Sequence, residues 1–449
     1  MAPSEEVKCN AQSNKGVELA PPSTFQEFLT SHPGVLFIRF QWQDYSGLLR
    51  ARMVTRQHAS AVAAGKTSLR VAPLAFSCLV DNSALPNTTA RGSHLLVADW
   101  SSLRARQSLD PLYASVMCSV AEQTPWTPGS NMNLCPRRAL EEVVRKATEA
   151  LQVNFLVGFE VEFEIMKATS DGNFVPYSVG LGNFAVSGLR DPCYVYVEEV
   201  VQSLLQAGVK IEAFHTEGRR GQYEIALGPL PPIQAVDQLV IVHDTIKHLF
   251  ARQGLLATMS PRPVALRRQS TGQHTHISIN PPGREESFLA GILLRLPQLC
   301  AFCLPYELSY ERIQPCFAGT VVAWGTENPW VPVRKIQAGH WEIRCVDATA
   351  NMYLALAAIL SAGMLGCLNR EPLLWQDTSF EGQAIPSSGT SMPRTINEAL
   401  ALLEKSSQEL EEVMGSEAIR HYLRVKKAEA SELRDMGSQE ARKLLVELF

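Results

Sequence analysis

Three glutamates stand at every second position in the segment GFEVEFEI, residues 158–165. Successive side chains of a β-strand point to opposite faces, so Glu160, Glu162 and Glu164 share one face and the apolar residues share the other. Carboxylates this close repel one another, and such a set of oxygen ligands suits a hard divalent ion such as Mg²⁺ or Mn²⁺. The segment therefore predicts a core strand with a metal-binding face. An amphipathic edge strand with a charged outer face is the alternative for this segment alone.

Two other segments alternate in the same way. HTHISIN, residues 274–280, places His274, His276 and Ser278 on one face of a strand, and WEIR, residues 341–344, places Glu342 and Arg344 on one face. A single histidine on a strand is usually a core residue. Two histidines at positions i and i+2, with a serine in line, favour a functional site.

A fourth strand adds more carboxylates. Glu217 precedes the glycine-flanked turn GRRG, and the strand after this turn, residues 222–227, carries Glu224. Four strands that each present a carboxylate or an imidazole toward one side predict a sheet that lines a single cavity.

The composition indicates a globular protein that acts on small molecules. The chain has 449 residues, of which 46% are hydrophobic and 19% are charged, and its formal net charge is -4. This balance shows no basic excess that would favour nucleic acid or an anionic membrane surface. Ten cysteines without a disulfide-dense spacing, no N-terminal secretory signal and no apolar run of transmembrane length predict reduced thiols and a cytoplasmic location.

The order of strand and helix signals predicts an α+β chain with two domains. Residues 1–20 are polar and are expected to form a disordered tail. Residues 21–124 are expected to form a small N-terminal domain, and residues 130–449 a larger second domain. A linker is predicted between them at Pro125, Pro128, Gly129 and Ser130.

Local patterns predict the elements within these domains. Residues 35–40 and 48–54 predict a β-hairpin around the turn DYSG. Further short strands are expected in the N-terminal domain at residues 68–80, 94–97 and 113–121. In the second domain, Asp191 and Pro192 predict the N-cap and first turn of a helix.

Taken in order, several segments resemble the glutamine synthetase family. The resemblance covers residues 136–366, with weaker similarity in the hairpin at 40–52. Its motifs are GFEVEFE, HTEGRRGQYEIA, ATMSPRP, STGQHTHISIN, SYERI, AWGTENPWVPVR and HWEIRCVDATANMYLALAAILSAG. The resemblance implies a β-grasp-like N-terminal domain, a catalytic domain whose curved antiparallel sheet lines the active site, and a ring-shaped homo-oligomer.

The resemblance also implies two or more Mg²⁺ or Mn²⁺ ions per site and ATP as a co-substrate. The ligands implied for the ion on the side of the acid substrate are Glu162, Glu217 and Glu224. The ligands implied for the ion that bridges the ATP phosphates are Glu160, His274 and Glu342. Such ions neutralise phosphates and orient in-line attack, which agrees with the interpretation from the strand pattern.

Five further residues receive roles from the resemblance. His276 lies near the substrate carboxylate, and Ser278 lies by the nucleotide. Arg312 and Arg344 hold the carboxylates of glutamate, for which a guanidinium group is well shaped, and Arg334 contacts the phosphates. The implied reaction is phosphorylation of the γ-carboxylate of glutamate by ATP, followed by attack of an amine on the acyl phosphate.

This chain departs from the family pattern where ammonium would bind. The flap that reads PGYEAP in members that use ammonia is PCFAGT here, residues 315–320, and contains no acid. The aspartate of the family's FDGSS segment has no counterpart in residues 71–80, and an expected arginine is Pro329. Such losses are typical of γ-glutamyl-amine ligases and of glutamine-synthetase-like domains in developmental proteins.

The leading hypothesis is therefore an ATP-dependent ligase that joins glutamate, or an analogue, to an amine other than ammonia. Phe317, near the lost flap acid, predicts an acceptor with an apolar or aromatic body; alternatively, Phe317 only packs the shortened loop. Two other functions stay open: a catalytically weak scaffold or signalling protein, and a true glutamine synthetase.

Overall fold

The structure is a computed structural model. It describes residues 23–105, 110–123, 131–180, 182–187, 191–267, 269–315, 317–379 and 389–449. The predicted tail, residues 1–20, and the linker residues Pro125, Pro128, Gly129 and Ser130 lie outside the described residues. The division into domains at this point stays a prediction.

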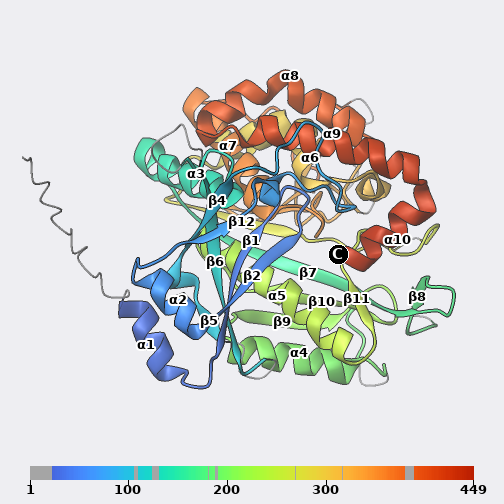
Figure 1. Ribbon diagram of the computed structural model, residues 1–449. Helices are drawn as coiled ribbons and strands as arrows, with labels where there is room; N and C mark the ends of the chain where they lie inside the picture. Colours follow the sequence, from blue (N-terminus) through green and yellow to red (C-terminus); the bar gives the residue numbers. More distant parts are fainter. Residues whose placement is uncertain are drawn as a thin grey trace, which may run out of the picture.

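A mixed sheet forms the N-terminal part of the chain (Figure 1). Within the described residues it has six strands in the order β2-β1-β6-β4-β3, with β5 paired to β6. The strands are β1 (Phe37–Gln43), β2 (Leu49–Thr55), β3 (Leu69–Val71), β4 (Ser93–Ala98), β5 (Arg104–Ala105) and β6 (Tyr113–Gln123). The predicted hairpin is confirmed as β1 and β2, which pair antiparallel, and β1 also pairs parallel with β6.

One strand prediction in this region was too long. Residues 68–80 contain only the short strand β3, because Pro73 begins a 3-10 helix, η1 (Pro73–Phe76). Proline has no N–H group to donate to a strand ladder, and its fixed φ suits the first turn of a helix. Two helices, α1 (Ser23–Ser31) and α2 (Arg56–Ala63), complete this part of the chain.

A second, curved sheet lies at the centre of the molecule. In the part of the chain that the structure describes it has nine strands in the order β13-β14-β15-β12-β7-β10-β9, with β8 and β11 paired to β7. The strands are β7 (Asn154–Ala168), β8 (Phe174–Pro176), β9 (Ile211–Thr216), β10 (Gln222–Leu227), β11 (Leu256–Thr258), β12 (Thr275–Asn280), β13 (Trp324–Thr326), β14 (Val333–Gln337) and β15 (His340–Ile343). Only β13 and β14 pair parallel among these described strands.

The glutamate strand, β7, is the central strand of this sheet. It pairs with β12 along residues 154–159 and with β10 and β11 along residues 160–166. The alternative of an amphipathic edge strand is therefore wrong. The registers place Glu162 opposite Glu224 and His276 opposite Glu342, so the pairing of strands brings distant parts of the sequence together.

Helices cover the apolar side of the sheet and one end of the molecule. They are α3 (Pro136–Leu151), α4 (Tyr194–Gln206), α5 (Pro232–Arg252), α6 (Glu285–Cys303), α7 (Met352–Asn369), α8 (Ile396–Met414), α9 (Ala418–Met436) and α10 (Ser438–Leu448). Figure 1 shows α6, α7, α8 and α9 gathered at one end, with α4 at the opposite end. Helix α4 begins at Tyr194 rather than at Pro192, because Asp191 accepts the N–H of Cys193 outside the helix.

Helices α6 and α7 are long and apolar enough to cross a membrane by length and composition, which the sequence analysis did not expect. Most of each helix is buried inside the molecule, as in the core helices of soluble proteins, so the finding is weak evidence for a membrane span. Their close packing depends on glycines. A Cβ atom on Gly366 would lie 2.0 Å from the carbonyl oxygen of Ser287 and 2.7 Å from Cα of Gly291.

We expect Gly366→Ala to destabilise the fold by about 1–3 kcal/mol, because backbone atoms of α6 cannot move aside without shifting the helix pair. Gly34→Ala is the matched control, since a Cβ atom at Gly34 meets nothing within 4 Å, and its effect should stay within about 0.5 kcal/mol. Urea unfolding followed by circular dichroism measures both changes. Equal stabilities of the two variants would contradict the close-packing argument.

Candidate active site

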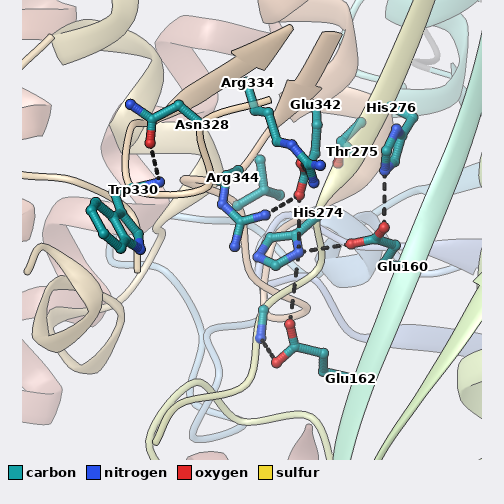
Figure 2. A network of polar contacts seen from close by, with 12 residues as sticks. Glu160, Glu162, His274, Thr275, His276, Asn328, Trp330, Arg334, Glu342 and Arg344 are labelled. Carbon is teal, nitrogen blue, oxygen red and sulfur yellow. Dashed lines mark hydrogen bonds and ion pairs between the residues drawn. The ribbon is translucent and has the colours of Figure 1, made fainter. Parts of the chain in front are cut away.

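One group of ligand-type side chains comes from three neighbouring strands. Nδ1 of His274 on β12 lies 2.9 Å from Oε2 of Glu160 on β7 and 3.3 Å from Oε1 of Glu342 on β15. Glu342 is fully buried, and His274 is buried as well. Figure 2 shows His274 between the carboxylates of Glu160, Glu162 and Glu342. The structure therefore brings together the three residues predicted to hold the ion on the ATP side.

A second pair of groups overlaps the first. Glu162, Glu224 and His274 have ligand atoms within 4.8 Å of one another, and so do His215, Glu217 and Glu224. The predicted set of Glu162, Glu217 and Glu224 is thus linked through Glu224, which belongs to both groups. His215 was not predicted. It lies on β9 opposite Glu224, and its Nε2 lies 3.1 Å from Oε1 of Glu224.

The crowding of carboxylates changes their pKa values. Burial, together with the charges of Glu162 and Glu224, raises the pKa of Glu217 to about 7. Burial also raises the pKa of Glu224, helped by the charges of Glu160 and Glu162 and opposed by the hydrogen bond of His215. That same hydrogen bond raises the pKa of His215 to about 9.

Glu160 behaves in the opposite way. Burial works to raise the pKa of its carboxyl, but the hydrogen bonds and charges of His274 and His276 outweigh burial and hold the pKa well below its usual range. Burial and the charge of Arg344 act to lower the pKa of His274, yet the hydrogen bond with Glu160 and the charge of Glu342 raise it. The two histidines therefore favour the ionised form of Glu160.

These residues fit divalent cations. The cluster offers carboxylate oxygens and imidazole nitrogens, a donor set that suits Mg²⁺ or Mn²⁺. Burial and the charges of the neighbouring carboxylates disfavour the ionised forms of Glu217 and Glu224. Ions placed among these groups would supply the missing positive charge.

Two predicted arginines meet at Glu342. Arg344 forms an ion pair with Oε1 of Glu342, and NH1 of Arg334 lies 3.3 Å from Oε2 of the same carboxylate. Arg334 also pairs with Glu327. Figure 2 shows both arginines beside His274. A guanidinium pair at the edge of a cluster of carboxylates and imidazoles is placed to bind phosphate or carboxylate groups of a substrate.

Arg312 has a different environment. Only 1% of its surface is exposed, and it donates to the carbonyl oxygens of Val346, at 2.6 Å, and Arg344, at 3.2 Å. Its Nε atom has no hydrogen-bond partner in the described chain. In this structure Arg312 braces the backbone that carries Arg344, and direct binding of glutamate by Arg312 stays a prediction.

His276 joins the cluster to a histidine that the sequence analysis missed. Its Nε2 lies 3.1 Å from Glu160, and its Nδ1 lies 3.0 Å from Nε2 of His340 at the start of β15. Ser278 lies opposite His340 on the neighbouring strand, one alternation farther from the carboxylates. His340 could have been found by extending the WEIR alternation back by two residues from Glu342.

Two aromatic residues lie at loops around the cluster. Phe317 is half-buried, and its N–H donates to the carbonyl of Gln314; Cys316 of the same loop lies outside the described residues. Trp330, which was not predicted, is 58% exposed, and its N–H donates to Asn328 at 3.0 Å. Figure 2 shows Trp330 beyond Arg344, on the side away from Glu160 in this view. The position of Phe317 in an acceptor site stays a prediction.

A cavity of about 570 Å³ lies elsewhere, between the 3-10 helix η4 (Glu307–Arg312) and helices α8, α9 and α10. Its lining includes Tyr306, Tyr310 and Glu311 but none of the predicted site residues. The predicted site residues therefore gather at the carboxylate cluster on the sheet and not at this cavity.

Comparison with known proteins decides the family. The family described as "Glutamine synthetase, catalytic domain" matches residues 133–443. The chain belongs to the glutamine synthetase family. This confirms the resemblance that the motifs carried, and with it the catalytic fold.

Relatives in the glutamine synthetase family include two of different length. The chain is 33% identical over 440 residues to "Protein fluG" of Emericella nidulans. The match covers 94% of this chain and 50% of fluG, so the chain spans about half of that protein's length. It is 29% identical over 414 residues to "Gamma-glutamylpolyamine synthetase GlnA3" of Streptomyces coelicolor, covering 82% of this chain and 84% of GlnA3.

A solved structure shares the fold. The structure titled "GmaS/ADP complex-Conformation 1" superposes with a TM-score of 0.79 at 21% sequence identity, and the match covers 93% of this chain and 98% of that one. The N-terminal sheet and the central sheet of this glutamine synthetase family member thus occur together in a known arrangement.

The raised pKa of Glu217 predicts metal binding that depends on pH. A carboxyl whose pKa rises from 4.5 to about 7 on folding favours its protonated form, so an ion must displace that proton below pH 7. We expect the affinity for Mn²⁺ to increase by up to about tenfold per pH unit between pH 5.5 and 7 and to level off above pH 7.5. Isothermal titration calorimetry in two buffers of different ionisation enthalpy measures affinity and proton release together.

Glu217→Gln should bind Mn²⁺ more weakly and release fewer protons at pH 6.5. An affinity that is constant from pH 5.5 to 8, with no proton release, would show that Glu217 does not hold the ion.

Proposed function

We propose that this chain is an ATP-dependent ligase that activates the γ-carboxylate of glutamate, or of a close analogue, as an acyl phosphate and joins it to an amine other than ammonia. The convergence of Glu160, His274 and Glu342 with Glu162 and Glu224 carries this proposal. A carboxylate cluster of this kind, flanked by arginines, supports phosphoryl transfer.

Each part of the cluster has a task in the proposed reaction. Glu160, His274 and Glu342 would hold one ion and Glu162, Glu217 and Glu224 another. Bound Mg²⁺ or Mn²⁺ ions supply positive charge to the phosphates and to the acid. Arg334 and Arg344, which both pair with Glu342, would stabilise negative charge on the transferring phosphoryl group. His276 would orient Glu160 through its hydrogen bond. Ser278 would lie beside the nucleotide.

The choice of amine rests on the flap. An ammonium ion must be attracted and deprotonated before it attacks, and a carboxylate does both. The loop around Phe317 offers no acid, and its backbone is fixed against Pro332, because a Cβ atom on Gly319 would lie 2.7 Å from Pro332 Cδ. The similarity to GlnA3, a γ-glutamylpolyamine synthetase, supports an acceptor larger than ammonia for this chain as well.

We expect glutamate-dependent phosphate release from ATP to be faster with an arylalkyl amine than with ammonium, because Phe317 favours an apolar body and no flap acid attracts a bare cation. Phe317→Ala should raise KM for the arylalkyl amine by about tenfold, the loss of one buried aromatic contact. A colorimetric phosphate assay with confirmation of the amide by mass spectrometry measures both.

Glu224→Ala is the inactive control, since it removes a ligand shared by two groups. Preference for ammonium would contradict the proposal and favour the alternative, a true glutamine synthetase. Absence of turnover with every amine would favour the scaffold or signalling function.

We also propose that the chain works in the cytoplasm as a ring-shaped homo-oligomer. Strand β2 is at an edge of the N-terminal sheet and its outer residues are exposed, with Met53 59% exposed, so this edge is open to a neighbouring copy.

Light scattering at micromolar concentration should therefore give a mass several times 49.5 kDa. Met53→Lys, on this edge, should lower that mass, whereas Val195→Lys on the exposed side of α4 should not. A monomer at working concentration would contradict the assembly.

A further inference from the structure

The third glutamate of β7 takes no part in the carboxylate groups described above. Glu164 lies two residues beyond Glu162 on the same face of the strand and is buried. It forms an ion pair with Arg267, whose side chain is 20% exposed. A guanidinium group therefore neutralises Glu164. The acidic face of β7 thus loses its net negative charge at Glu164, about 7 Å beyond Glu162.

Residues of one short segment, from Arg267 to His274, contact all three glutamates of β7. Arg267 pairs with Glu164, the N–H of Gly272 donates to Oε2 of Glu162 at 2.9 Å, and His274 contacts Glu160 at 2.9 Å. Residues 267 and 269–274 thus run along the acidic face. Arg267 is fixed at the end of this run, on the far side of Glu162 from the nucleotide-side group of Glu160 and Glu342.

A second guanidinium lies at that end. Arg219 is in the turn that follows Glu217, and its Nε donates to Oε1 of Gln269 at 2.9 Å. Among the described residues, the hydrogen bond to Gln269 is made by Nε alone, and the two terminal nitrogens form no hydrogen bond or ion pair. The turn is held closely, because a Cβ atom on Gly182 would lie 2.5 Å from Cα of Arg219.

Arg219 differs from Arg267 in its partners. Arg267 is paired with the Glu164 carboxylate, whereas the Nε of Arg219 donates to a neutral amide oxygen, that of Gln269. A guanidinium whose Nε is tied to Gln269 presents its two terminal nitrogens as a fork, the geometry that binds a carboxylate with two hydrogen bonds. The fork of Arg219 is thus left for a ligand.

An aromatic ring lies on the same side. Phe184 is 68% exposed and packs edge-on against His215, with ring centroids 5.2 Å apart. Its loop is bonded to Thr216, next to Glu217, through the N–H of Ala185 and the carbonyl of Val186. The end of the site near Glu217 therefore combines an apolar surface with a free guanidinium group.

We propose that Arg219, with Arg267 behind it, binds an anionic group on the amine acceptor, so that the preferred acceptor carries a carboxylate separated from its amine by an apolar spacer. This inference rests on the proposed ligase function. The phosphates and the carboxylates of glutamate are already assigned to Arg334 and Arg344 near Glu342, which leaves this guanidinium for the third substrate. Dicationic polyamines are disfavoured here by repulsion of like charges.

Three acceptors of equal length test the inference: 4-aminobutyrate, butylamine and putrescine. Amide formation with glutamate and ATP, measured by mass spectrometry, should give a kcat/KM for 4-aminobutyrate about tenfold or more above that for putrescine. Arg219→Gln should raise KM for 4-aminobutyrate about tenfold, while kcat and the KM values for butylamine and glutamate change by less than about twofold.

Arg219→Glu is the decisive variant, because a merely structural role of Arg219 would not reverse a preference. It should favour putrescine over 4-aminobutyrate. Arg220→Gln is the matched control, since Arg220 is the next residue and lies 3.8 Å from Asp191, and it should keep the wild-type preference. Thermal unfolding of each variant shows whether it is folded.

The outcomes separate this inference from the proposed function. If the wild-type protein prefers putrescine, or if neither Arg219→Gln nor Arg219→Glu changes the preference among amines, the inference is wrong. The proposed ligase function is unaffected by either result. A rise in KM for glutamate in Arg219→Gln assigns the anionic group to the acid substrate and also overturns it. Absence of amide with every amine overturns the ligase function and the inference together.

Discussion

Repulsion between buried carboxylates is the constraint on which this molecule depends. Two unit charges 4 Å apart repel by about 4 kcal/mol at the effective dielectric constant of a protein surface, and more in its interior. Here five carboxylates face one space on the central sheet. They are Glu160, Glu162, Glu217, Glu224 and Glu342. Such a cluster persists only where cations are supplied, by the protein or by ligands.

The protein supplies part of that charge in an uneven way. Glu160 and Glu342 have histidine and arginine partners, and the pKa of Glu160 is low. Glu224 lies near both His215 and His274, yet burial and the neighbouring carboxylates raise the pKa values of Glu217 and Glu224. Glu217 and Glu224 are thus the carboxylates whose charged forms gain most from a bound ion. Ion binding and the stability of the charged cluster are consequently linked, because a bound cation offsets the repulsion between the carboxylates.

The scaffold makes this arrangement rigid. Strand β7 is hydrogen-bonded on both sides, and its apolar face packs on α3 and α5, so its glutamates cannot turn away from one another. The glycine contacts between α6 and α7 hold the helices that cover the core. The residues that we propose to select the acceptor, Phe317 and Arg219, lie in loops outside the strands of the sheet. The proposed chemistry and the proposed selection are thereby placed on different parts of the chain, which lets one change without the other.

The sequence by itself determined the faces of the strands. Alternation with a period of two assigned Glu160, Glu162 and Glu164 to the same face of one strand. The order of motifs carried the resemblance to the family, and the hairpin of β1 and β2 followed from its turn. These features depend on residues close together in the chain, whose geometry local rules describe.

Only the tertiary structure decided which neighbours those faces meet. It made β7 a central strand and not an edge, brought His215 to Glu224 and His340 to His276, and turned Arg312 toward backbone carbonyls. It also gave Glu164 an arginine in place of an ion. These outcomes depend on register between strands and on loops that pack across 50 or 100 positions of sequence, as with the Arg267 and Glu164 pair, 103 positions apart. A local period carries no information about such distances, because any of several registers preserves it.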